Sequence, residues 1–327
     1  MTSIIIMNRC ISLFLFLFIC VSVIGQDLLW KRVGNTNSNV HDFCVSKSGT
    51  YLFATDLNRV NLFNLRNCDL IETINAFDST AIYSLALSKD SLYLVAGTSA
   101  GRIYLYNFSS HKSTALGILH SKITCVDINA GNKTVAFGTF SGQTGILSME
   151  GIQIRKFSLH NDLVTRVSLS LDGKYLASSG MDGKIMIYYL QDSARQICLI
   201  NKKKSCRSIM FSENSSYLIA GFDDGSMIQW KVGPSGIFSS VSTRWMTGWI
   251  TSVAFDINDY IMAACTIEGR ILISTQFGYY EKNLHLPFNQ VKFASVKLPV
   301  LSVLVSAFNS GLYLIPASSL NYSGNNN

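Results

Sequence analysis

The residues that could carry acid, base, nucleophilic or metal chemistry are few and scattered in this chain. The five histidines, His41, His111, His120, His160 and His285, stand far apart, and none belongs to an HExxH pair. The cysteines form no CxxC pair, and neither a GxSxG nucleophile elbow nor a phosphate-binding P-loop occurs. We therefore predict no catalytic residue, no metal site and no cofactor.

The cysteines also indicate how the chain is held together. Six of the eight follow the apolar N-terminal segment, and their spacing shows no regular disulfide framework. This favours buried thiols. Cys198 and Cys206 flank one loop and could meet, so a disulfide between them stays open as an alternative.

Composition favours a folded protein with mild positive charge. Hydrophobic residues make up 48% of the 327 residues and charged residues 14%, which is enough for a large core. Lys and Arg exceed Asp and Glu by 27 − 20 = 7. The one dense basic run, residues 202–204 with Arg207, is predicted to be a solvated loop, with a site for an anionic partner as the alternative. The basic residues do not form a stripe, so no nucleic-acid partner is predicted.

The N-terminus resembles a secretory leader. Arg9 precedes an apolar run over residues 11–24 that ends at Gly25, a small residue suited to cleavage. The run is about 14 residues, short of the roughly 20 that cross a bilayer. We predict a signal peptide over residues 1–25 and a place in the secretory lumen or outside the cell. The alternative is an uncleaved signal anchor, which would make the protein membrane-bound.

Four sequons bear on the same question. They begin at Asn107, Asn132, Asn214 and Asn321. Each could accept an N-linked glycan, but a chain this rich in Asn, Ser and Thr contains about four by chance. The glycoprotein prediction therefore depends on the leader.

A sequence unit recurs every 41 to 43 residues. In its clearest copy, residues 164–169, 175–180 and 184–190 alternate as strands separated by turns, and a looser fourth strand lies near 195–200. A sheet of four such strands must stack on neighbours to bury both faces, which is typical of a propeller blade. The repeat is marked by an aromatic or polar residue that begins the second strand, at Tyr51, Tyr93, Thr134, Tyr175, Tyr217 and Tyr260, with a seventh copy near Val303.

Several copies resemble the repeat of the WD40 family. Residues 170–180 read SLDGKYLASSG and lead to Asp182-Gly183-Lys184; residues 248–255 read GWITSVAF, and residues 221–226 read GFDDGS ahead of Trp230. The resemblance covers nearly everything after residue 27. It implies a β-propeller that binds other proteins.

The copies also depart from that family. Family blades are stiffened by a hydrogen-bonded tetrad of His, Ser or Thr, Asp and Trp, and only Trp230 keeps the Trp. The fourth copy approximates the tetrad with His160, Ser178 or alternatively Ser179, Asp182 and Tyr188. The resemblance thus implies structural roles for these residues and for Asp224 and Trp230.

The ends of the repeat array predict how the ring closes. The seventh copy supplies strands around residues 291–296, 303–307 and 312–315, and residues 28–33 would provide its missing fourth strand. The predicted fold is all-β: a seven-bladed propeller of four-stranded antiparallel blades over residues 26–317, closed by the N-terminal strand. Residues 318–327, rich in Ser and Asn, are predicted to be a disordered tail.

The family resemblance implies where a partner would bind: on the loops that enter each inner strand and join the two middle strands. Trp249 is the leading candidate, because aromatic and Arg side chains are enriched at protein interfaces. Trp245 could instead pack between blades. The predicted partner-binding residues are Trp249, Arg166, Phe222, Met181, Lys122 and Trp245.

The function predicted from the sequence is a non-catalytic protein-binding scaffold, a monomeric propeller within a complex. One alternative is a membrane-anchored scaffold with its propeller in the cytosol. Another is a propeller hydrolase or oxidoreductase, which would need a metal or cofactor in the central channel.

Overall fold

The computed structural model describes residues 31–33, 40–151, 154–157, 159–192, 195–201, 203–233, 236, 238–255, 261–275, 278–283, 288–295, 301–307 and 311–316. The chain divides into two compact units, residues 1–30 and 31–327, and only the second is described below. The predicted signal peptide and C-terminal tail lie outside the described residues.

The fourth blade shows why these residues form strands. Its strand β15 (Tyr175–Gly180) is buried at every position. A central blade strand is covered on both faces by the sheets beside it, so it is apolar or small throughout rather than alternating. The hydrophobic effect of stacking sheets thus stabilises the strands.

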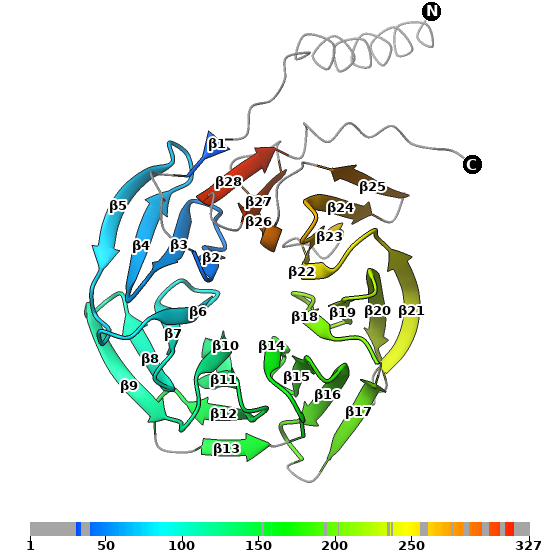
Figure 1. Cartoon of the computed structure of the whole chain (residues 1–327). Helices are drawn as coiled ribbons and strands as arrows, with labels where there is room; N and C mark the ends of the chain where they lie inside the picture. Colours follow the sequence, from blue (N-terminus) through cyan, green and yellow to red (C-terminus); the bar gives the residue numbers. More distant parts are fainter. Residues whose placement is uncertain are drawn as a thin grey trace, which may run out of the picture. The chain divides into compact units, whose positions relative to one another are not determined.

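Six blades are sheets of four consecutive antiparallel strands (Figure 1). The first holds β2 (Phe43–Val45), β3 (Tyr51–Asp56), β4 (Arg59–Asn64) and β5 (Asp69–Ile74); the second holds β6 (Ile82–Leu87), β7 (Tyr93–Thr98), β8 (Arg102–Asn107) and β9 (Lys112–Ile118). The third holds β10 (Ile123–Asn129), the 3-10 helix η1 (Ala130–Asn132), β11 (Thr134–Thr139), β12 (Thr144–Ser148) and β13 (Ile154–Phe157).

The next three blades continue the pattern. The fourth holds β14 (Val164–Leu169), β15, β16 (Lys184–Tyr189) and β17 (Gln196–Asn201); the fifth holds β18 (Cys206–Phe211), β19 (Tyr217–Phe222), β20 (Ser226–Val232) and β21 (Phe238–Trp245). The sixth holds β22 (Ile250–Phe255), β23 (Ile261–Thr266), β24 (Arg270–Thr275) and β25 (Gly278–Asn283).

The remaining sheet is assembled from both ends of the described chain. It contains β26 (Phe288–Ser295), β27 (Leu301–Ala307), β28 (Gly311–Pro316) and, beside β28, the short β1 (Lys31–Arg32). Lys31 pairs with Leu314 and Arg32 with Tyr313.

The prediction of a seven-bladed propeller of four-stranded blades is therefore wrong: the structure has six blades of consecutive strands. Six blades are continuous repeats, and the closing sheet is of a different kind, because a circular array of sheets must join its two ends somewhere. Of the expected closing strand 28–33, Lys31 and Arg32 are paired with β28 and Val33 N donates to Leu312 O, whereas residues 28–30 lie outside the described part of the chain.

The innermost strands follow one another around the centre of the ring (Figure 1), where residues of these strands line a central channel. Each contacts the innermost strand of the next sheet, in the order β2, β6, β10, β14, β18, β22, β26 and back to β2. The channel is thus bounded by strands that lie far apart in the sequence.

Neighbouring inner strands are also linked by side chains. In each link, a side-chain oxygen on or just before one inner strand accepts the backbone N–H of a residue on the next. The described links join Leu85 N to Asp42 Oδ2 (2.9 Å), Val126 N to Ser84 Oγ (3.0 Å), Leu169 N to Asp127 Oδ2 (2.7 Å), Phe211 N to Ser168 Oγ (3.0 Å) and Val253 N to Ser208 Oγ (3.1 Å). The polar inner-strand residues therefore connect the blades.

Candidate functional site

The loops and turns predicted to bind a partner share one repeated backbone hydrogen bond, and together they are called here the Trp249 face. This face comprises the loops that enter the inner strands and the turns between the second and third strands of the blades. In each described case, the turn donates a backbone N–H to the carbonyl just before an inner strand. The pairs are Ser99 to Ala81 (2.8 Å), Phe140 to Lys122 (2.9 Å), Met181 to Leu163 (3.0 Å), Asp223 to Ser205 (3.0 Å) and Ile267 to Trp249 (3.1 Å).

Trp249 is held on this face by a charged neighbour. Its side chain is 46% exposed, and the Arg207 guanidinium carbon lies 4.9 Å from its ring centroid. Arg207 is itself fixed by Asp223, to which both Nε and Nη2 donate, the second at 3.2 Å. The indole is therefore pre-oriented while much of its surface remains in solvent.

Sequence reasoning missed the role of Arg207, which it treated as part of a basic run. Arg207 is skipped in the β18–β19 register, where a bulge separates the pairs of Cys206 and Ser208. A bulge re-aims the side chain of the extra residue. A bulge at the second residue also occurs in five other inner strands, but the amino-acid sequence of the repeat does not indicate it.

Further large apolar side chains are exposed on the same face. Trp245 ends β21 beside the loop to β22 and is 63% exposed, so the alternative in which it packs between blades is not observed. The exposed residues that accompany the two tryptophans in these turns and loops are Leu57, Ile118, Phe140 and Ile267.

Lys122 belongs to a second cluster on this face. Its ammonium lies 3.1 Å from the centroid of the Tyr83 ring, and Tyr83 stacks on His41 with centroids 4.3 Å apart. Burial, with a contribution from the Lys122 charge, lowers the pKa of His41, so this imidazole is neutral near pH 7. The cluster presents one net positive charge on an aromatic support.

Arg166 lies inside the channel and crosses it. On β14 of the fourth blade, it donates through Nη1 to Asp42 Oδ2 of the first blade at 3.3 Å. Asp42 is 1% exposed and also accepts from Ser84 Oγ. Burial, the largest single influence, opposes the charge of Arg166, but Asp42 together with smaller contributions from Cys125 and Asp127 raises the pKa of Arg166. We interpret this pair as a structural link across the channel.

Two other predicted contact residues are placed differently. Phe222 is fully buried in the apolar cluster between the fourth and fifth blades, so its predicted exposure on the Trp249 face is wrong. Phe222 is the last residue of β19, and the turn begins only after it. Its ring therefore packs in the core between the two blades instead of on the exposed turn. Met181 is partly exposed in its turn, and its carbonyl accepts from the Ser205 hydroxyl at 3.0 Å.

The predicted tetrad is formed in part. His160 Nδ1 lies 3.0 Å from Asp182 Oδ1, and His160 Nε2 lies 2.7 Å from Ser178 Oγ. Burial lowers the pKa of His160, so the ring is neutral; Nδ1–H donates to the carboxylate, and Nε2 accepts from the hydroxyl. Tyr188 is 1% exposed and stacks on Phe157 with centroids 4.3 Å apart.

Asp224 and Trp230 of the fifth blade, for which structural roles were predicted, make contacts within the fold. Asp224 Oδ1 accepts the Ser226 N–H at 2.9 Å, which closes the turn between β19 and β20. Trp230 is 4% exposed and packs in the cluster shared by the fourth and fifth blades.

The described cysteines form no disulfide, and the described residues contain no cluster of metal ligands. The six cysteines in the described ranges are free, so the Cys198–Cys206 alternative is wrong: Cys198 is exposed on β17, whereas Cys206 is buried on β18. Burial raises the pKa of the Cys125 and Cys265 thiols to about 12, which makes them unreactive. No group of three metal-ligating side chains gathers among the residues described.

Among the described residues, no helix combines the length and the apolar character needed to cross a bilayer.

Comparison with known proteins supports a β-propeller fold built from WD-type repeats. A family model described as "WD domain, G-beta repeat" matches residues 68–107, and one described as "Vps42 beta-propeller" matches residues 117–233. The chain folds as a β-propeller, and the two matched segments are similar to WD40-type and propeller repeats.

Individual relatives are distant. The WD repeat-containing protein SL1-17 of Schistosoma mansoni is 26% identical over 151 residues, which is 45% of this chain; the match spans half the length of that relative. The solved structure of U3-55K aligns with a TM-score of 0.73 at 14% identity, over 88% of this chain and 98% of that one.

A second solved structure agrees with the first. The Cps50 (Swd1) β-propeller domain of Myceliophteria thermophila has a TM-score of 0.73 at 11% identity, over 89% of this chain and 98% of that one. At such identities the likeness concerns the fold alone.

Proposed function

We propose that this protein is a non-catalytic scaffold that binds a protein partner through its Trp249 face. The observation that carries the proposal is the half-exposed indole of Trp249, held against Arg207, which is itself fixed by Asp223. Interface hot spots are typically aromatic or Arg side chains, and an already ordered side chain loses little entropy on binding.

The partner would be recognised mainly through apolar contact. The Arg207 charge is balanced by Asp223, while Leu57, Ile118, Phe140 and Ile267 add exposed apolar surface on the same side of the blades. Lys122, on its Tyr83 support, would add one point of attraction for an acidic group. A propeller monomer within a larger complex fits this division of roles.

Replacing Trp249 tests the proposal. In Trp249→Ala, affinity for a co-purified partner is expected to fall at least tenfold, which corresponds to about 1.4 kcal/mol. The partner would be identified by affinity purification with mass spectrometry, and its affinity measured by titration calorimetry.

Leu92→Ala is the matched control. Leu92 is 45% exposed, close to the 46% of Trp249, but lies in the β6–β7 turn at the other end of the blades. Its affinity should equal that of the wild type. Equal affinity of Trp249→Ala and wild type would reject this face as the binding surface.

We further propose that the protein acts in the secretory pathway or outside the cell, on the strength of the apolar run that ends at Gly25. A native N-terminus at Gln26 and glycans on the sequons are expected by mass spectrometry. The second candidate is a membrane-anchored scaffold with a cytosolic propeller, which the six free cysteines favour. An intact Met1 with unmodified sequons would establish that candidate instead.

A further inference from the structure

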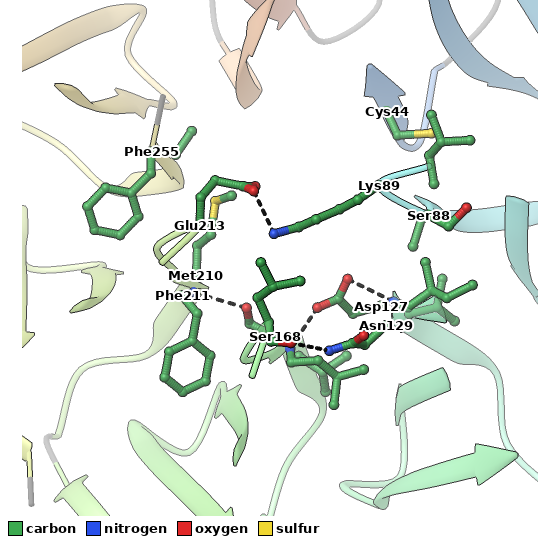
Figure 2. A pocket seen from close by; sticks show the side chains of 18 of the residues that line it. Cys44, Ser88, Lys89, Asp127, Asn129, Ser168, Met210, Phe211, Glu213 and Phe255 are labelled. Carbon is green, nitrogen blue, oxygen red and sulfur yellow. Dashed lines mark hydrogen bonds and ion pairs between the residues drawn. The ribbon is translucent and has the colours of Figure 1, made fainter. Parts of the chain in front are cut away.

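A cavity of about 730 Å³ occupies the channel at the end opposite the Trp249 face (Figure 2). Its walls are the second halves of the inner strands and the turns that follow them, whereas the Trp249 face surrounds the points where these strands begin. The volume suits a small organic molecule or a single long side chain. The cavity is thus separate from the proposed protein-binding surface.

The wall of the cavity is mixed, with more apolar than polar surface. Such a surface favours an apolar stem over a fully hydrated ion. Apolar residues of the lining lie on five successive inner strands, and the following are each only 2–4% exposed because their side chains pack mainly in the core beside the channel: Leu85, Val126, Val167, Ile209, Phe211 and Val253.

One ion pair crosses the cavity. Lys89 Nζ lies 2.5 Å from Glu213 Oε2, with the side chains 38% and 30% exposed (Figure 2). Lys89 follows β6 in the second blade and Glu213 follows β18 in the fifth, so the pair joins turns three blades apart. Exposed ion pairs contribute little net stability, so another cation can replace Lys89 at small cost.

The charge of the cavity selects a cation over an anion. Deeper in the channel, Asp42 balances Arg166, and Asp127 adds a further carboxylate that accepts the Ile128 and Leu169 N–H groups at 2.8 and 2.7 Å. The described lining holds four acidic residues against three basic ones: Asp90, Asp127, Asp172 and Glu213, against Lys47, Lys89 and Arg166. An added anion would meet this excess of carboxylates.

We propose that this cavity binds a primary ammonium group carried on an aliphatic stem, whose nitrogen takes the place of Lys89 at Glu213. Lys89 is the intramolecular stand-in for that ligand: its own four-carbon stem spans the mixed wall and delivers an ammonium to the carboxylate. The ligand chemistry can come from a free aliphatic amine or from a lysine side chain of a bound protein.

Two probes distinguish these sources. Titrations with n-butylammonium chloride and with an unstructured lysine-containing peptide, followed by ligand-observed NMR, measure the affinity of each. An acetyl-lysine peptide, which has the stem without the charge, should not bind. Binding of the amine alone indicates a small-molecule ligand, and binding of the peptide indicates a protein lysine; either result supports the site.

Variants test the mechanism of displacement. Lys89→Met keeps the apolar stem but removes the competing ammonium, so the amine should bind about two- to fivefold more tightly. Glu213→Gln removes the acceptor charge and should weaken binding at least about tenfold. Lys112→Met and Glu150→Gln change exposed charges outside the cavity and are expected to match the wild type.

Unchanged affinity in Glu213→Gln, or a failure of both ammonium probes to bind wild type and Lys89→Met, would overturn the proposal. Preferential binding of sodium acetate would overturn it as well. Thermal unfolding of each variant verifies that the propeller is intact. Because Trp249 lies at the other end of the inner strands, Trp249→Ala should leave amine binding unchanged, so failure of one proposal does not imply failure of the other.

Discussion

At the scale of single residues, His160 shows how this protein uses a titratable group for structure. Its ring is buried, and its two nitrogens are occupied by Asp182 and Ser178. Burial, the largest influence, lowers the pKa of His160, although the nearby carboxylate acts in the opposite direction. The neutral ring connects Asp182, in the turn between β15 and β16, to Ser178 on β15. Both of its nitrogens are therefore occupied and neither is free for catalysis.

This arrangement predicts a pH dependence of stability. The folded state disfavours protonated His160, so the unfolded chain takes up the proton at higher pH. The stabilisation is present above the unfolded pKa of about 6.5 and is lost as the pH falls through the lower folded pKa. The free energy of unfolding, measured by urea denaturation, should therefore decline from pH 7.5 to pH 5.

His160→Asn separates this effect from other groups. The variant should be less stable at pH 7.5, yet should lose less stability on acidification than the wild type. His41, whose pKa is also lowered by burial, remains in both proteins and supplies the same background. Identical slopes for variant and wild type would show that His160 does not titrate in this range.

At the scale of elements, the links between inner strands explain why several channel residues are polar. Ser84, Ser168 and Ser208 are each nearly excluded from solvent and each accept an N–H from the following blade. A buried hydroxyl without a hydrogen-bond partner would lower the free energy of unfolding. We therefore interpret these buried serines as hydrogen-bond links between blades. The links add directional bonds to the apolar stacking of blades.

Removing one link tests its contribution. Ser168→Ala leaves the buried N–H of Phe211 without its side-chain acceptor, and the free energy of unfolding should fall by about 1–3 kcal/mol. Ser110→Ala, an exposed serine in the β8–β9 turn, is the control and should change it by less than about 0.5 kcal/mol. Equal values for the two variants in chemical denaturation would contradict a role for the link.

At the scale of the whole described unit, stability depends on joining its two ends. β1 covers the edge of β28, Val33 N donates to Leu312 O at 2.8 Å, and the Val33 side chain is buried beside Leu312. An uncovered sheet edge loses these contacts and exposes unpaired backbone groups.

A truncated chain beginning at residue 34 should therefore have a lower Tm than one beginning at residue 26. Each kcal/mol lost corresponds to about 2–4 °C for a domain of 150–250 residues, and to somewhat less for a larger ring. The aggregation of both chains on heating should be followed by light scattering, with more expected for the shorter one. Coincident melting curves would indicate that β1 does not close the ring.

The sequence by itself determined the repeating part of this fold. The 41 to 43-residue period located the beginning of the second strand in six blades to within one residue, and turn residues such as Asp182 and Asp224 marked where second strands end. Local alternation and turn chemistry carry this information, and both are visible in a single chain. The resemblance to WD40 repeats indicated which loops to consider for partner binding, and that assignment stays a prediction.

Only the tertiary structure decided which side chains meet. The bulge that aims Arg207 at Trp249, the burial of Phe222, and the pairs Arg166–Asp42 and Lys89–Glu213 have no sequence signature. Each of the two ion pairs joins residues 124 positions apart. The physical reason is that closing the ring brings distant blades to face one another across the channel, so the partners of an inner-strand residue are set by the circumference and not by its neighbours in the chain.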